Sequence, residues 1–164
     1  MPTRVRNVLV MQTYLETLTR HAEVFNNAPL EEKPKRRLFV VVSSDKGLCG
    51  GIHSSVSKAT RRAIAEAESS DSPIMVVGDK SKAQLSRTLS KNLVLTFNQI
   101  GRDIPTFADA AGVADLLVKS GVEYDAIRIV YNKFVSALSY ESAEMDVLND
   151  KGLKEARELP MLLY

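Results

Sequence analysis

Residues 38–53 read LFVVVSSDKGLCGGIH, and this stretch decides the fold class. Its first part, residues 38–44, is rich in β-branched and apolar side chains, which predicts a buried strand. Three glycines, Gly47, Gly50 and Gly51, then mark a tight turn, and a helical pattern begins directly after it. A buried strand that runs through a glycine-rich turn into a helix is the opening unit of many α/β folds.

Strands and helices continue to alternate after this unit. Apolar, β-branched runs predict further strands at residues 74–77, 93–97 and 126–131, and a neighbouring strand at 139–147. A short helix is predicted at residues 81–89. This alternation predicts an α/β domain of Rossmann-like type, in which helices cover both faces of a mostly parallel sheet.

Two of the predicted helices have a clear apolar stripe. In the helix after the glycine turn, the stripe consists of Ile52, Val56, Ala59 and Ala63. In the later helix, Thr106 and Asp109 have the spacing of a capping box, and Gly121 stands where a C-terminal cap belongs. For that helix we expect a buried stripe of Phe107, Ala110, Ala111, Ala114, Leu117 and Val118.

Apolar residues also repeat near the N-terminus, with alternating spacings of three and four. The repeat consists of Val8, Met11, Leu15, Leu18, Ala22 and Phe25. A period of 3.5 predicts a coiled-coil seam, and an amphipathic helix lying on its own domain remains the alternative. We therefore divide the chain into a helical segment (1–27), a linker (28–37), the α/β domain (38–150) and a C-terminal segment (151–164).

The composition limits the classes of function. The chain has 164 residues, of which 45% are hydrophobic and 26% charged, with a net charge of +2. This balance gives no strong attraction to nucleic acid, and no apolar run approaches the roughly 20 residues that span a bilayer. The single cysteine, Cys49, excludes an intrachain disulfide.

The glycine-rich turn is a candidate phosphate site, because turn amides in front of a helix N-terminus can hold an anion. Its spacing, GLCGG, matches neither the dinucleotide nor the P-loop pattern, and Lys46 precedes the glycines. Asp79 follows a predicted strand, where a ribose-binding acid would lie in a dinucleotide fold. A small nucleotide- or phosphate-binding Rossmann-like enzyme therefore stays open as the alternative to a purely structural turn.

Other catalytic or metal chemistry is not indicated. Cys49 and His53 are four residues apart, but a nucleophilic pair also needs a group that orients the histidine and donors for an oxyanion. The second histidine, His21, lies far away in sequence, so a zinc site is not expected. We predict no catalytic residue, no metal and no cofactor.

Four stretches carry a resemblance to a known family. They read VSSDKGLCGGIHSSVSK (42–58), VVGDK (76–80), LTFNQIGRDIPTFADA (95–110) and IVYNKFVSALSYES (129–142). The chain resembles the gamma subunits of F-type ATP synthases over the whole α/β domain, and the motif GIHSSVSK is closer to the mitochondrial branch.

This resemblance implies a non-catalytic rotor subunit in the central stalk. Its partners would be the alpha and beta subunits of the catalytic ring, the epsilon and delta stalk subunits and the membrane c-ring. The location would be the matrix side of the mitochondrial inner membrane, peripheral and without membrane insertion. Relative to the family, the chain is expected to be truncated at both ends, because most of the N-terminal helix and the C-terminal helix are missing.

The resemblance also implies a set of subunit-contact residues. The matching loop in the family faces an acidic segment of a beta subunit, and Lys46 is expected to contribute electrostatically to that contact. The full set is Asp45, Lys46, Gly47, Leu48, Cys49, Gly50, Gly51 and His53. The seam residues of the N-terminal segment would form the lower end of the coiled coil.

Overall fold

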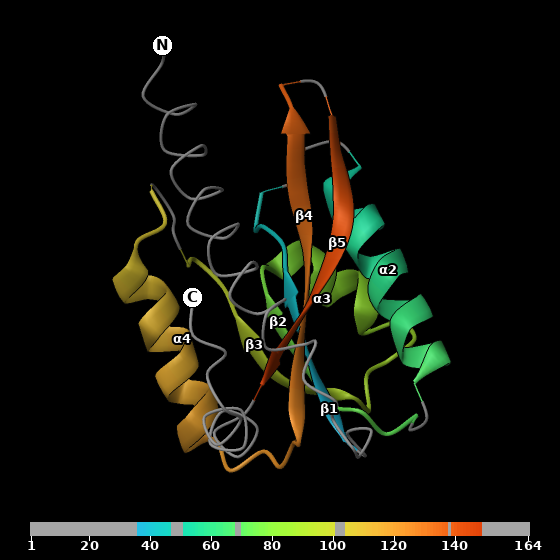
Figure 1. Cartoon of the computed structure of the whole chain (residues 1–164), viewed down its shortest axis with the longest axis vertical. Coiled ribbons are helices and arrows are strands. Elements are labelled where there is room, and N and C mark those ends of the chain that lie inside the picture. The colour runs from blue at the N-terminus through green and yellow to red at the C-terminus, as the bar shows by residue number, and fades with distance from the viewer. Residues whose placement is uncertain (1–35, 47–50, 68–69, 101–103, 138, 149–164) are drawn as a thin grey trace, which may run out of the picture.

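A five-stranded sheet in the order β3-β2-β1-β4-β5 organises the fold (Figure 1). The strands are β1 (Arg37–Val42), β2 (Ile74–Val77), β3 (Leu93–Phe97), β4 (Ala126–Ser136) and β5 (Ser139–Leu148). The β1–β2, β1–β4 and β2–β3 pairs are parallel, whereas β5 pairs antiparallel with β4. The predicted mostly parallel sheet is therefore confirmed.

The computed structural model describes residues 36–46, 51–67, 70–100, 104–137 and 139–148. The predicted coiled-coil seam at residues 8–25 and the C-terminal segment at 151–164 lie outside these ranges. So does the part of the glycine-rich turn between residues 47 and 50.

Helices cover the two faces of the sheet. Helices α2 (Ile52–Glu66) and α3 (Asp79–Leu85) lie on one side, and α4 (Phe107–Lys119) lies on the other (Figure 1). The central strand β1 supplies both cores, because alternate side chains of a strand point to opposite faces. Phe39 and Val41 pack with α2 and α3, whereas Leu38 and Val40 pack on the face of α4. Burial on both sides explains the uninterrupted apolar run of β1.

The ends of several elements differ from the prediction, and β4, predicted at residues 126–131, continues to Ser136. The strand predicted at residues 38–44 ends at Val42, although the Ser43 N–H still donates to the Val77 carbonyl at 2.8 Å. The helix predicted at residues 81–89 is α3, which begins at Asp79 and ends at Leu85. Its early start follows from a contact of the Asp79 N–H, described below.

The ends of α4 match the prediction, but its buried face does not. Thr106 and Asp109 form the capping box, and Gly121 has a φ of +73° beyond the C-cap. Of the six stripe residues, only Leu117 is buried, whereas Phe107 is 76% exposed and Val118 is 73% exposed. The predicted stripe is wrong because the helix packs on the sheet through Leu117 and Val113. Val122 and Tyr124, which follow the helix, pack against the same core.

Candidate functional site

The Asp45 side chain connects the carboxyl ends of three neighbouring strands. It follows β1, and its Oδ1 accepts a hydrogen bond from the Asp79 N–H, just after β2, at 2.9 Å. Its Oδ2 accepts one from the Gln99 N–H, just after β3, at 2.6 Å. A carboxylate that receives two backbone donors is a strong, charge-assisted acceptor. Asp45 therefore holds the starts of two loops in place, and it fixes the first residue of α3.

The backbone around this carboxylate is unusual at two positions. Gln99 has a φ of +57°, the left-handed region that non-glycine residues rarely adopt. The short bond to Asp45 helps to hold Gln99 in that conformation. Gly78 has a φ of +111°, and a Cβ there would lie 2.5 Å from the Ser43 Oγ and 2.8 Å from the Ser43 carbonyl carbon. The close approach of β1 and β2 at their ends therefore requires a glycine at position 78.

The backbone carbonyl of Lys46, the residue after Asp45, is also held by hydrogen bonds. It accepts a hydrogen bond from His53 Nε2 at 3.0 Å and from the Ser44 hydroxyl at 3.2 Å. Since a carbonyl only accepts, the His53 Nε2 must carry the proton. His53 lies in the first turn of α2 and is buried, with 5% of its surface exposed. The Lys46 side chain is exposed.

Only some of the predicted contact residues can be placed. Lys46, in the turn after β1, contacts His53 through its carbonyl, and Asp45 directly precedes it with its side chain bonded to Asp79 and Gln99. Gly51 is the N-cap residue of α2 and is exposed. The other predicted contacts, Gly47, Leu48, Cys49 and Gly50, lie outside the described residues.

The β4–β5 hairpin contacts the start of α2, beside the position where a nucleotide would be expected. Ligands of open α/β sheets bind beyond the carboxyl ends of the strands where the strand order reverses, here between β1 and β4. The hairpin extends past the other strands (Figure 1). Its Asn132 amide donates to the Ile52 carbonyl at 3.1 Å, and the Tyr140 hydroxyl lies 3.1 Å from where a Gly51 Cβ would stand. A bound phosphate would have to lie at the N-terminus of α2. The chain's own hairpin already contacts this end of the helix.

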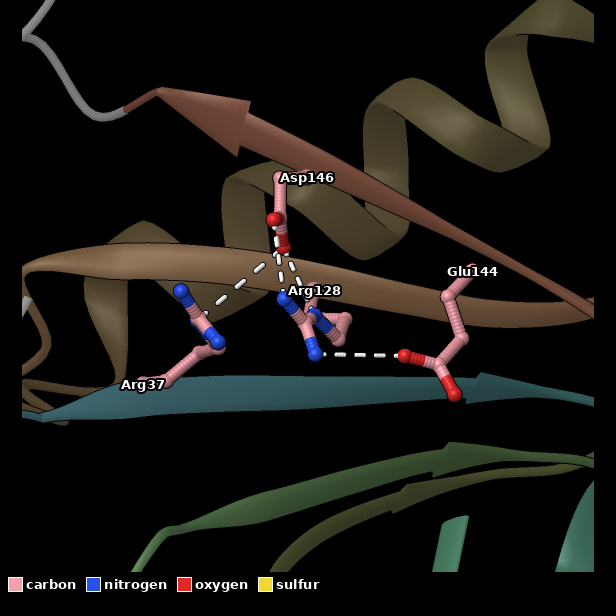
Figure 2. Close-up of polar contacts among 4 residues, drawn as sticks. All are labelled: Arg37, Arg128, Glu144 and Asp146. Carbon is pink, nitrogen blue, oxygen red and sulfur yellow. Dashed lines mark hydrogen bonds and ion pairs between the residues drawn. The ribbon is translucent and has the colours of Figure 1, made fainter. Parts of the chain in front are cut away.

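A charged cluster that sequence reasoning missed joins β4 and β5 (Figure 2). The Arg128 guanidinium donates to both carboxylate oxygens of Asp146, at 2.7 and 2.9 Å, and to Glu144 at 3.2 Å. Arg37 on β1 contributes a longer ion pair of 3.9 Å to Asp146. Arg128 and Asp146 are directly opposite in the antiparallel register. The cluster therefore fixes how the hairpin strands align.

Burial and charge act in opposite directions on these groups. Partial burial raises the pKa of Asp146, but the hydrogen bonds and charge of Arg128 and the charge of Arg37 outweigh burial, so the pKa falls below its ordinary value. The hydrogen bonds of Asp146 raise the pKa of Arg128, with smaller contributions from the charges of Asp146 and Glu144. The available signal was the alternation of polar residues in β5, at Ser142, Glu144 and Asp146, but Arg128 lies 16 and 18 residues away from Glu144 and Asp146.

Two negative findings apply to the described ranges. No group of three or more His, Cys, Asp or Glu side chains there has the arrangement of a metal site. In the same part of the chain, no helix combines the length and the apolar character needed to cross a bilayer.

The chain is similar to gamma subunits of mitochondrial ATP synthase. A family model described as ATP synthase matches residues 4–161. The chain is 43% identical over 128 residues to the mitochondrial ATP synthase subunit gamma of Pichia angusta, which covers 78% of this chain and 46% of that protein. It is 44% identical over 124 residues to the mitochondrial subunit gamma of Saccharomyces cerevisiae, and this alignment covers 74% of this chain and 39% of that protein. The chain thus spans about half the length of the curated relatives it matches, or less.

Solved structures give the same result for the fold. The central stalk and c-ring structure of the Tetrahymena thermophila mitochondrial ATP synthase matches with a TM-score of 0.67 at 26% identity, over 87% of this chain and 62% of that chain. The rotor structure of the Euglena gracilis mitochondrial ATP synthase matches with a TM-score of 0.64 at 19% identity. This match covers 90% of this chain and 59% of that chain, and it shows a shared fold. The family predicted from the sequence is confirmed, and the chain belongs to the ATP synthase family, with mitochondrial gamma subunits as its relatives.

Proposed function

We propose that this chain supplies the α/β domain of the gamma subunit in the rotor of a proton-translocating F-type ATP synthase. In that role it catalyses no reaction and helps to couple proton flow through the membrane ring to ATP synthesis. The observation that carries the proposal is the family match over residues 4–161. The hairpin that lies against the start of α2 supports it further, because it disfavours the nucleotide-binding alternative.

The proposed partners follow from the assemblies to which the relatives belong. They are the alpha and beta subunits of the catalytic ring, the epsilon and delta stalk subunits and the c-ring, at the matrix side of the mitochondrial inner membrane. The names of the relatives support a mitochondrial location, and the matching structures include the c-ring and the central stalk. The proposed association is peripheral.

The division of the chain remains part of this proposal. Residues 1–27 would contribute the lower end of a coiled-coil helix through the seam described above, residues 28–37 a linker, and residues 151–164 a truncated C-terminal segment. β1 begins at Arg37, so the α/β domain starts at the end of the proposed linker. The turn at residues 45–51 would face an acidic segment of a beta subunit, with Lys46 as the attractive charge.

Assembly and nucleotide binding together test the proposal. The purified chain would be mixed with epsilon and delta subunits and analysed by size-exclusion chromatography, while nucleotide binding to the free chain is measured by calorimetry. A Tyr140→Ala variant, which removes the side chain beside Gly51, serves as a control for the nucleotide arm. We expect a stable complex, and no heat of nucleotide binding from either form.

The opposite pattern would overturn the proposal. If the chain binds nucleotide and forms no complex with the stalk subunits, the Rossmann-like enzyme is the better description. If only the Tyr140→Ala variant binds nucleotide, the hairpin covers a site that is still competent, which also contradicts a purely structural turn.

A further inference from the structure

The outer side of α4 is an apolar surface that no described element covers. We propose that in the free chain this surface is the docking site for the chain's own N-terminal segment. The outer stripe of α4 consists of Phe107, Ala111, Ala114 and Val118. The segment docks through the part of its apolar repeat that consists of Met11, Leu15, Leu18 and Ala22. These residues lie outside the described ranges, so the repeat enters here through its sequence.

The outer stripe is apolar and open to a partner. Phe107 is 76% exposed and Val118 is 73% exposed, and the two alanines between them are exposed as well. Spacings of four, three and four residues place the stripe along one side of the helix. The same spacing rule puts the charged residues on other sides, where Asp115 pairs with Lys119 and Asp109 belongs to the capping box. α4 therefore presents an uncharged flank of the kind that binds another helix.

The N-terminal repeat matches the outer stripe in spacing and in size. Its four residues are also separated by four, three and four positions. In a parallel helix pair, equivalent positions of the two seams face each other. The resulting layers are Met11–Phe107, Leu15–Ala111, Leu18–Ala114 and Ala22–Val118. Leucines meet alanines in the two middle layers, so large and small side chains interdigitate, and the first layer is a favourable contact of sulfur with an aromatic ring.

The start of β1 supports both the direction and the reach of the segment. The Arg36 N–H donates to the Asp125 carboxylate at 3.0 Å, and the Asp125 N–H donates to the Arg36 carbonyl at 2.8 Å. Asp125 follows Lys119, the last residue of α4, by six residues. The N-terminal segment is therefore attached toward the C-terminal end of α4, as a parallel pair requires. Thirteen residues separate Ala22 from Arg36 and can span up to about 40 Å, so reach does not limit docking.

Attachment to the same chain favours this occupant over a second copy or a separate protein. The four layers extend over about 16 Å of helix, which is too short to bury the roughly 1,200 Å² of a stable complex between separate proteins. A flexible linker instead gives the segment an effective concentration in the millimolar range beside α4. A helix pair that is too weak between molecules can therefore form within one.

The docked state has a consequence for assembly, and only this consequence rests on the proposed function. In the rotor, the same repeat would form the seam of a coiled coil, and it cannot face two helices at once. The coiled coil therefore requires that the segment leave α4. Until then, docking keeps the methionine and leucines of the repeat out of water, which lowers the tendency of an exposed apolar stripe to aggregate.

Disulfide trapping in the free, full-length chain tests the docking. Leu18→Cys and Ala114→Cys would be combined in a Cys49→Ser background, and the purified chain would be oxidised mildly at low micromolar concentration. We expect an intramolecular disulfide, identified by mass spectrometry. The matched control combines Leu18→Cys with Gly112→Cys, because Gly112 lies on the opposite side of α4 with open space around its Cβ position. The control yield should be at least about fivefold lower.

A second measurement needs no oxidation. Ala111→Glu places a carboxylate in the middle of the outer stripe and keeps a good helix former. Amide exchange in residues 8–25 should become about fivefold faster, with unchanged exchange in β1 as evidence that the domain is folded. Unchanged exchange in residues 8–25 would contradict the docking.

The other outcomes are equally informative. Equal yields from the two cysteine pairs would show that the segment has no preference for the outer stripe, and the proposal would be wrong. Disulfide-linked dimers alone would identify a second copy as the occupant and would also overturn it. In a chain assembled with the other ATP synthase subunits, the yield should fall. If it falls only in the control, or stays as high as in the free chain, the proposed coiled-coil seam is wrong although the docking stands.

Discussion

Arg128 and Asp146 lie opposite each other on β4 and β5 and share two hydrogen bonds of 2.7 and 2.9 Å. The pair is bidentate: the Nε and Nη2 nitrogens of Arg128 donate to the two carboxylate oxygens of Asp146, a geometry that lysine cannot reproduce. It is also partly shielded, since the Arg128 and Asp146 side chains are 23% and 36% exposed. Because the pKa of Asp146 is lowered in the folded protein, the contribution of this pair to the stability of the hairpin depends on pH.

We expect Asp146→Asn to lower the free energy of unfolding at neutral pH by about 1 kcal/mol, a modest value because solvent screens a side chain that is one third exposed. The pKa of Asp146 is lowered in the folded state. Its stabilisation is therefore fully present above the unfolded pKa of about 3.9 and is lost as the pH falls through the lower folded pKa. Urea denaturation of both proteins at pH 7 and near pH 2 would measure this, and the difference should vanish in acid.

The exposed pair Lys119–Asp115 is the matched control for this experiment. Its side chains are 69% and 60% exposed and lie four residues apart on α4. Asp115→Asn should leave the urea midpoint unchanged at both pH values, since such surface pairs contribute little. A difference between Asp146→Asn and wild type that persists undiminished at pH 2 would contradict the assigned charge effect.

Gly78→Ala should be among the most destabilising substitutions in this domain. The new Cβ would meet the Ser43 backbone at 2.8 Å while φ stays at +111°. We expect a loss of about 3 kcal/mol or more, measured by thermal or urea unfolding.

Substitutions at two other glycines separate the cost of the backbone conformation from the cost of the steric overlap. Gly121 has a φ of +73° but open space around it, so Gly121→Ala should cost about 1 kcal/mol from the backbone conformation alone. Gly112 lies within α4 with nothing near its Cβ position, so Gly112→Ala should stabilise by about 0.5–1 kcal/mol. Equal effects at positions 78 and 121 would mean that the overlap with Ser43 is relieved without cost.

Substitutions on α4 can decide which face of the helix packs on the sheet. Leu117→Ala should cost about 2–4 kcal/mol, because this side chain is buried among Leu38, Val40 and Met75. The neighbouring Val118→Ala should cost less than about 0.5 kcal/mol, because Val118 is 73% exposed. Chemical denaturation of the two variants is sufficient, and a large loss at Val118 would restore the stripe predicted from the sequence.

Loss of the α4 cap should destabilise that helix locally. In Thr106→Ala, the Asp109 N–H loses its hydroxyl acceptor, which lies at 3.2 Å in the native protein. A cost of about 1 kcal/mol is typical for such a cap. Hydrogen exchange should show faster opening of the first turn of α4 with unchanged β1 amides, and equal acceleration in both elements would argue against a local effect.

The sheet was predictable because its signals are local. Apolar runs such as residues 38–42 and the glycine at position 121 determine strand and helix limits over a few residues. The face of α4 was not predictable in the same way, because a stripe rich in alanine leaves several orientations with similar apolar content. The choice between them depends on Val122 and Tyr124, which pack on the same core from outside the helix.

In the candidate site, too, some features could be predicted from the sequence and others could not. The turn after β1 stood out in the sequence, but the role of Asp45 did not, since its partners Asp79 and Gln99 are 34 and 54 residues away. A lone acid near a glycine turn has no pattern that distinguishes an internal acceptor from an external contact. Only the geometry of the strand ends separates Asp45, which is engaged internally, from Lys46, which is exposed.

The position of β1 in the centre of the sheet has a consequence for biosynthesis. Its neighbour β4 follows far along the chain, and the contact between Arg36 and Asp125 at its start closes a separation of 89 residues. Non-local pairing of this kind slows folding. A nascent chain that has emerged only as far as β3 carries β1 as an open, apolar edge, a feature that favours aggregation. The edge of β1 can therefore be covered only after β4 has left the ribosome, and the sheet is complete only once β5 follows, so arrest-peptide force measurements should place the folding event beyond residue 136.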